Sequence, residues 1–232
     1  MTPPQPPSRA QAFDPQQTEL QKRAAALAAA ELVEDGARVG LGTGSTVAHL
    51  LPALAGRGLR GVLCVATSPA TERAARALGL SLRTLDELGE LDIAIDGADQ
   101  IDQRGWLIKG GGASHTREKI VARAARRFVV IASAEKAVEC VSAPVPLELL
   151  RFGAQSTLHA LGRAQLRDAP PSPDGNLIAD YLGDVGDPAT VAAWLSSTPG
   201  IVEHGLFAPE LVSDVLIAGA DGVEHTAGAK RD

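Results

Sequence analysis

Glycines and hydroxyl side chains gather in the segment "VGLGTGSTV", which joins an apolar run to a helix-like one. The glycines are spaced by two, and three hydroxyl residues stand among or after them: Thr43, Ser45 and Thr46. Glycines let backbone N–H groups approach a ligand, hydroxyls donate hydrogen bonds, and a helix N-terminus carries partial positive charge. The pattern favours an anion-binding loop; the alternative is an ordinary turn with a serine or threonine cap.

Carboxylates follow the strand-like run in "IAIDGADQID". Asp96 and Asp99 stand just past the apolar residues, and Asp102 comes three residues later. Ligands bind outside the carboxyl ends of strands in open parallel sheets, so Asp96 and Asp99 are candidate catalytic residues. Asp-Gly is also common turn chemistry, which remains the alternative, and Asp102 is interpreted as solvated charge.

Lysine and glycine end another strand-like run, "WLIKGGG". Lys109 is followed by Gly110, Gly111 and Gly112, and then by a helix-like segment. A lone lysine is usually a surface residue. At the carboxyl end of a strand and beside three glycines, it favours a charge directed into a cleft.

Glu118 is the most informative single residue. On a helix that begins near Ser114, its neighbours three, four and seven residues on are Val121, Ala122 and Ala125, which place it at the edge of the apolar face. No lysine or arginine stands three or four residues after it to form a routine helical ion pair. A carboxylate on this side favours a general base; the alternative is an acid that stabilises the helix N-terminus.

These segments together supply an anion cradle, two carboxylates, an ammonium group and a third carboxylate. The set suits proton transfer on a polar, phosphorylated small molecule. The sequence has neither the GxGxxG fingerprint of dinucleotide-binding loops nor a Walker loop. Its histidines, cysteines and acids show no metal-ligand spacing, so no metal and no cofactor is expected.

Alternating strands and helices must position these residues. Strands are predicted at residues 37–42, 62–68, 81–85, 91–96, 106–109 and 128–132, and helices at 18–33, 45–56, 70–79 and 114–127. Because the strands are continuously apolar rather than alternating, they predict an α/β fold with a mainly parallel sheet.

A second, smaller α+β domain is predicted at residues 146–207, where the sequence pattern changes. Its expected elements are helices at 154–161 and 187–197, a strand at 177–184 and the turn-rich segment "RDAPPSPDGN". Residues 213–226 are again strand-like and are expected to return to the main sheet. The main domain then comprises residues 18–145 plus 208–232.

Composition is that of a globular protein: 232 residues, 45% hydrophobic, 22% charged and only 3% aromatic. The net charge of −6 argues against nucleic acid or an anionic membrane as the main partner. Cys64 and Cys140 stand far apart and suggest reduced thiols in a cytoplasmic protein. No apolar segment approaches the ~20 residues of a membrane span. Residues 1–17, rich in proline and glutamine, are interpreted as a disordered tail.

Four motifs give the chain a resemblance to a known family: "GLGTGSTVAHL", "DGADQID", "KGGGASHTREKIVA" and a late "DGV", in this order. Across residues 18–225 the chain resembles ribose-5-phosphate isomerase, A type. The resemblance implies interconversion of ribose 5-phosphate and ribulose 5-phosphate in the pentose phosphate pathway. It also implies a Rossmann-like main domain, a small α+β domain, no cofactor, and a homodimer or homotetramer.

Carried over by position, the resemblance implies Glu118 as the proton acceptor. It implies a substrate site lined by Thr43, Gly44, Ser45, Thr46, Asp96, Gly97, Ala98, Asp99, Lys109, Gly110, Gly111 and Gly112. Lys136 in "SAEKAV" matches a substrate-binding lysine, and Lys22 in the first helix matches a basic residue that reaches the phosphate.

Departures from the family pattern fall beside these motifs. Gln100 stands where the family usually has glutamate, and Ser114 and His115 replace small or apolar residues. None removes a catalytic group, but Gln100 and His115 can change the electrostatics of the site or its preference among sugar phosphates.

The expected mechanism moves a proton between C1 and C2 through a cis-enediolate, with Glu118 as the base. Lys109 stabilises the developing oxyanion, and Asp96 or Asp99 moves the hydroxyl protons. Two other classes remain as alternatives. A sugar-phosphate sensor would not need Glu118 and normally carries a DNA-binding segment, whereas a dinucleotide oxidoreductase would carry the glycine fingerprint.

Overall fold

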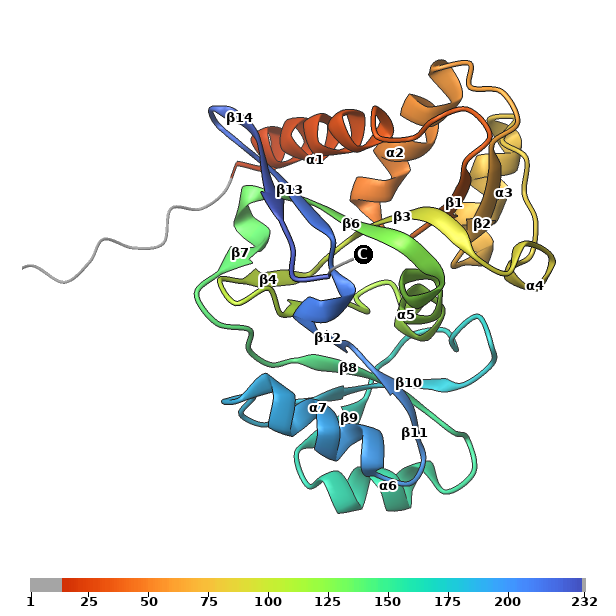
Figure 1. Ribbon diagram of the computed structural model, residues 1–232. Coiled ribbons are helices and arrows are strands. Elements are labelled where there is room, and N and C mark those ends of the chain that lie inside the picture. Colours follow the sequence, from red (N-terminus) through yellow and green to blue (C-terminus); the bar gives the residue numbers. More distant parts are fainter. Residues whose placement is uncertain (1–13, 231–232) are drawn as a thin grey trace, which may run out of the picture.

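The computed structural model describes residues 14–230 and is built around a six-stranded sheet with the order β14-β13-β6-β3-β1-β2 (Figure 1). Its strands are β1 (Arg38–Leu41), β2 (Leu63–Ala66), β3 (Leu91–Gly97), β6 (Ala125–Ser133), β13 (Asp214–Gly219) and β14 (Gly222–Ala227). Neighbouring strands from β2 to β13 are parallel, and β14 is antiparallel to β13. The predicted α/β fold with a mainly parallel sheet is confirmed, as is the return of residues 213–226 to it.

The strand order reverses at β1. From β1 the chain adds β2 on one side, and later β3, β6 and β13 on the other. At such a reversal the connections leave in opposite directions and open a crevice at the carboxyl ends of the two central strands. The crevice in this sheet therefore lies above the ends of β1 and β3.

Helices cover both faces of the main sheet (Figure 1). α1 (Pro15–Ala30) and α2 (Ser45–Gly56) pack on one face, and α5 (His115–Ala124) packs on the other. β3 serves both cores, because Ile93 and Ile95 face the first and Ala94 the second. A Cβ atom at Gly40 of β1 would collide with Val121, so this glycine lets α5 pack closely on the sheet.

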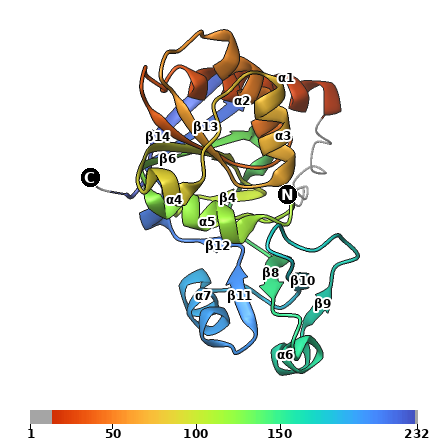
Figure 2. The same cartoon turned by 90° about the vertical axis from the view of Figure 1, so that its right-hand side faces the viewer.

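Two further sheets complete the fold. The lower sheet, named for its place in Figure 2, has the order β11-β8-β10-β9 and is antiparallel. It comprises β8 (Val145–Leu149), β9 (Ala164–Leu166), β10 (Leu177–Tyr181) and β11 (Ile201–His204), with helices α6 (Ala154–Leu161) and α7 (Pro188–Ser197). A small sheet of β12 (Leu206–Phe207), β5 (Leu107–Ile108), β4 (Gln100–Asp102) and β7 (Ala137–Val138) lies between it and the main sheet.

The remaining elements are short. They are α3 (Pro69–Ala77), α4 (Leu85–Leu88) and the 3-10 turns η1 (Ala134–Lys136) and η2 (Pro209–Leu211). In the described part of the chain, no helix is long and apolar enough to cross a membrane.

Three element predictions are corrected. Residues 81–85 do not form a strand: Leu82 makes one isolated bridge to Cys64, and Thr84 caps α4 with Glu87 in a reciprocal capping box. The helix predicted at 114–127 ends at Ala124, because the chain turns directly into β6. The strand predicted at 106–109 belongs to the small sheet, where β5 is antiparallel to β4 and β12.

The first helix begins earlier than predicted. Asp14 accepts a hydrogen bond from the Gln16 backbone N–H as the N-cap, and Pro15 occupies the first turn. Residues 15–17, assigned to the tail from the sequence, are therefore helical. The rest of the predicted tail, residues 1–13, lies outside the described residues.

Candidate active site

A cavity of about 100 Å³ lies at the carboxyl ends of β1 and β3, in the crevice defined by the strand order. Its lining residues are Thr43, Gly44, Ser45, Thr46, Gly97, Ala98, Asp99, Lys109, Gly110, Gly111, Gly112, Glu118 and Lys136. The structure thus brings together almost all of the predicted site residues, although they come from five separate stretches of the chain.

The loop between β1 and α2 is built to leave backbone N–H groups open. Gly44, the N-cap of α2, has a φ of +127°, which favours glycine, and no side chain caps the first turn. The sequence had left open a turn capped by serine or threonine, and the structure shows no such cap. Uncapped N–H groups with the helix dipole behind them suit a bound anion such as a phosphate.

Asp96 organises the site from behind the cavity wall. Its Oδ1 accepts hydrogen bonds from the backbone N–H groups of Thr43, at 3.1 Å, and Gly97, at 2.7 Å. The carboxyl approaches the backbone so closely that a Cβ at Gly42 would overlap it. Asp96 therefore joins the β1–α2 loop to the end of β3 through two backbone bonds.

Lys109 lies between two carboxylates. Its Nζ is 2.8 Å from Asp96 Oδ2 and 3.1 Å from Glu118 Oε2, and it donates to the Gly97 carbonyl at 2.5 Å. All three side chains are about 3% exposed. Two carboxylates and one ammonium group thus share a pocket that is nearly closed to water, in which charges interact strongly.

Burial and charge set the protonation of this group. For Lys109, burial alone would lower the pKa, but Asp96 and Glu118 outweigh it and raise the pKa, so the ammonium persists. For Glu118, burial and the neighbouring Asp96 raise the pKa to about 8, although Lys109 acts in the opposite direction. Burial also raises the pKa of Asp96. A carboxyl group with a pKa near neutrality is suited to accept and return a proton.

Asp99 and Asp102 have different surroundings. Asp99 lines the cavity, and its Oδ2 accepts the Gly111 N–H at 2.8 Å. Asp102 is buried rather than solvated: its Oδ1 accepts from the backbone N–H groups of Arg104 and Trp106. It therefore shapes the turn between β4 and β5, and its interpretation as spare surface charge is wrong.

The two further predicted lysines differ in their relation to the cavity. Lys136 lines the cavity from η1. Lys22 is not among the lining residues; its Nζ pairs with Glu19 Oε1 at 2.6 Å. Gln21, one residue earlier, accepts the Ala134 N–H, so this turn of α1 lies against the turn that carries Lys136.

The residues that depart from the family pattern lie beside the cavity rather than in its wall. Gln100 points to the backbone of Ser142, to which its amide both donates and accepts. His115 is fully buried against Gly110, and burial lowers its pKa to about 4, so it is neutral near pH 7. Neither side chain brings a charge to the site.

The fold and the site together define a class of protein. A carboxyl of raised pKa, a buried ammonium group and an uncapped helix N-terminus can move a proton on an anionic small molecule. Among residues 14–230, no cluster of three or more His, Cys, Asp or Glu is arranged to hold a metal ion.

Comparison with known proteins identifies the family of this chain. Residues 63–222 match the family model of ribose 5-phosphate isomerase A (phosphoriboisomerase A). The ribose-5-phosphate isomerase A of Methanosarcina acetivorans is 46% identical, covering 87% of this chain and 92% of the relative. The chain therefore belongs to the ribose 5-phosphate isomerase A family.

Solved structures agree with that assignment. The Neisseria gonorrhoeae ribose 5 phosphate isomerase A superposes with a TM-score of 0.87 at 30% identity, covering 90% of this chain and 97% of that one. A D-ribose-5-phosphate isomerase in complex with phospho-erythronic acid superposes with a TM-score of 0.85 at 32% identity, covering 90% and 99% of the two chains.

Proposed function

We propose that this protein interconverts D-ribose 5-phosphate and D-ribulose 5-phosphate through a cis-enediolate, in the non-oxidative pentose phosphate pathway. The observation that carries the proposal is the Glu118 carboxyl, held 3.1 Å from the Lys109 ammonium group at the wall of a cavity with a phosphate-type loop. Family membership and the phosphorylated ligand of a solved relative support it.

In the proposed mechanism, each charged group has one role. Glu118 takes the proton from one sugar carbon and returns it to its neighbour on the same face. Lys109 stays protonated and stabilises the enediolate oxygen as negative charge develops. Asp99, which lines the cavity, moves the hydroxyl protons, while Asp96 holds Lys109 and the two loops in place.

In this proposal the phosphate binds at the N-terminus of α2, which no side chain caps. The N–H groups and hydroxyls of the 43–46 loop would hold it, with Lys136 adding positive charge. Lys22 would join them only by leaving Glu19. Holding the phosphate fixes the distance from C1 and C2 to Glu118, which lowers the entropic part of the barrier.

The direct test is to add ribose 5-phosphate to the purified protein without metal or nucleotide and to measure ribulose 5-phosphate. Turnover supports the proposal. Tight binding without turnover would overturn it and favour a sensor of sugar phosphates.

Chelation is expected to leave the activity unchanged, because the proposed steps use only protein groups. The measurement compares kcat after dialysis against EDTA with kcat in buffer. Activity that disappears with the chelator and returns with one added metal would contradict this mechanism.

The pH dependence should report Glu118. A base must be ionised to accept a proton, and the pKa of this carboxyl is raised to about 8. We therefore expect kcat/KM to fall as the pH drops below about 8 and to level off above it. A profile flat from pH 6 to 9 would show that no group with this pKa limits the reaction.

Organisation and location are further parts of the proposal. The main sheet and its helices would form the catalytic Rossmann-like domain, residues 18–145 plus 208–232, with residues 146–207 as a small α+β domain. We also propose a cytoplasmic homodimer or homotetramer that acts on the sugar phosphate without nucleic acid or membrane partners. The net charge of −6 supports the last point.

A further inference from the structure

The loop that carries Lys109 has no side chains of its own to hold it beyond that residue. Gly110, Gly111 and Gly112 follow, and Gly110 has a φ of +114°. Because glycine is the most flexible residue, contacts to the backbone must set the position of this 109–112 loop. On the main-sheet side, Asp99 Oδ2 accepts the Gly111 N–H at 2.8 Å.

Arg167 contacts the same loop from the lower sheet. Its NH1 group donates to the Gly110 carbonyl at 2.9 Å and to the Gly111 carbonyl at 3.4 Å. Its Nε and NH2 groups bind the two oxygens of Asp180 at 3.0 and 2.5 Å. All three guanidinium nitrogens are thus engaged, two by a carboxylate and one by the loop.

The paired strands β9 and β10 hold Arg167 and its partner Asp180 in place. Arg167 directly follows β9, and its backbone N–H continues the ladder to the Ile178 carbonyl of β10. Asp180 lies on β10 and pairs with Gln165 of β9. The side chains of Arg167 and Asp180 are only 23% and 15% exposed. A fork-shaped group on two paired strands can hold a partner in one orientation.

We propose that Arg167 is a positioning residue, which holds the 109–112 loop so that Lys109 and the loop N–H groups face the substrate. The inference rests on the function proposed above and extends it to a residue outside the cavity wall. Arg167 acts through the loop and not as a phosphate ligand, because Asp180 matches its charge and it does not line the cavity.

The peptide between Gly110 and Gly111 transmits this effect. In a trans peptide the C=O and N–H groups point in opposite directions. Arg167 binds the oxygen of this peptide and Asp99 binds its N–H, so the unit is held at both ends. The positive charge on the oxygen also polarises the peptide and strengthens its bond to Asp99. Arg167 thereby fixes the orientation of the carboxylate assigned to the hydroxyl protons.

The first test measures activity. Arg167→Ala should lower kcat/KM about 10–100-fold, since misplacing reacting groups by about 1 Å can have such an effect. The pH at which kcat/KM falls should stay near the wild-type value, because Arg167 does not touch Glu118. Added guanidinium ion, below denaturing concentrations, should restore part of the activity. The Arg167→Lys variant should remain as impaired as Arg167→Ala, because an ammonium group cannot bind Asp180 and the loop in two directions.

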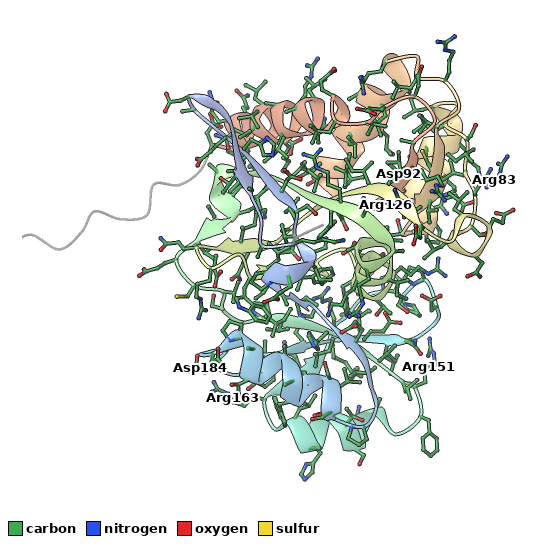
Figure 3. The ribbon with its side chains drawn as sticks, viewed as in Figure 1. Arg83, Asp92, Arg126, Arg151, Arg163 and Asp184 are labelled. Atoms are coloured by element: carbon green, nitrogen blue, oxygen red, sulfur yellow. The ribbon has the colours of Figure 1, made fainter. Side chains whose placement is uncertain are left out.

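Arg151→Ala is the matched control. Arg151 also belongs to the lower half of the molecule, at its outer edge (Figure 3), and its Nε donates to the Gly175 carbonyl at 2.6 Å. The Arg151→Ala variant therefore loses an arginine–carbonyl hydrogen bond of the same kind, but its side chain does not contact the 109–112 loop. This variant should keep wild-type kcat/KM and should not respond to guanidinium.

The second test needs no turnover. Hydrogen exchange of the amides at residues 110–113 should be at least several-fold faster in Arg167→Ala than in wild type, and unchanged in Arg151→Ala. The positioning role would be overturned if these amides exchanged in Arg167→Ala at the wild-type rate. It would also be overturned if their exchange became faster by the same factor in Arg167→Ala and Arg151→Ala. Because exchange is measured without substrate, this result separates the inference from a failure of the proposed isomerase activity.

Discussion

The Glu118→Gln variant is expected to fold and to bind ribose 5-phosphate normally while its kcat falls about 10²-fold or more. Glutamine keeps the size of the side chain, and its amide oxygen still accepts from Lys109, but it cannot take a proton. The loss should fall on kcat rather than KM, because proton transfer belongs to the transition state. Exchange of the C2 proton with solvent, measured by NMR, should slow in parallel.

Stability gives this variant an internal check on folding. The raised pKa of Glu118 means that the folded state holds its proton more tightly than the unfolded chain. The resulting stabilisation is complete below about pH 4.5 and is lost as the pH rises through about 8. Glutamine cannot ionise, so at pH 9 the variant should be at least as stable as wild type in urea unfolding.

Glu72→Gln provides the control for the same chemical change at an exposed site, where Glu72 pairs with Arg76 on α3. It should leave kcat unchanged. A folded Glu118→Gln variant with near-normal kcat would end the assignment of Glu118 as the base. The base would then have to be sought at Asp99 or Asp96, and Glu118 would be a charge that stabilises the start of α5.

The cavity wall was predictable from the sequence because its residues follow strands. β1 and β3 are parallel neighbours, so the residues that follow them, the 43–46 loop and Asp99, meet at the same edge of the sheet. Lys109 was expected at this edge for the same reason, but it follows β5 of the small sheet, so the parallel sheet does not explain its place in the cavity. Glu118 was found by another signal, its position on the apolar side of a helix without a cationic neighbour. The structure adds the distances among Glu118, Lys109 and Asp96, which depend on packing.

Other contributions had no local signal. Arg167 lies 57 residues from Gly110, and nothing in "AQLRD" indicates that its partners are glycine carbonyls. Asp96 was expected to line the substrate site; it is not among the residues that line the cavity, and its Oδ1 accepts the backbone N–H groups of Thr43 and Gly97. The burial of Asp102 arises from a turn whose neighbours Arg104 and Trp106 donate to it.

The missed strands have a common physical cause. β7 and β12 have two residues each and pair with segments far away in the chain, so they show no periodicity. Residues 81–85 are apolar enough for a strand, but the Thr84 capping box starts α4 there. The helix before β6 ends at Ala124 although alanine and arginine favour continuing it, because β6 must pair with β3 from Ala125 onward.

Replacing Lys109 by methionine should have the second large effect and should change the pH profile as well as the rate. Methionine fills a similar volume but leaves the enediolate oxygen without a cation, so kcat should fall about 10²–10³-fold. In the wild type, Lys109 lowers the pKa of Glu118, whereas burial and Asp96 raise it. In Lys109→Met the pKa of Glu118 should therefore rise, and the fall in kcat/KM should begin at a higher pH than the wild-type value of about 8.

Lys119→Met is the matched control for this experiment. Lys119 is also a buried lysine near the Phe207 ring, 4.8 Å from its centroid against 5.4 Å for Lys109, but its ammonium group pairs with Glu203. Loss of Lys119 should therefore leave the pH profile in place, whatever it does to stability. If Lys109→Met lowered kcat with an unshifted profile, Lys109 would act on the substrate alone and not on Glu118. If both variants shifted the profile equally, the effect would come from loosened packing around Phe207 rather than from the charge beside the base.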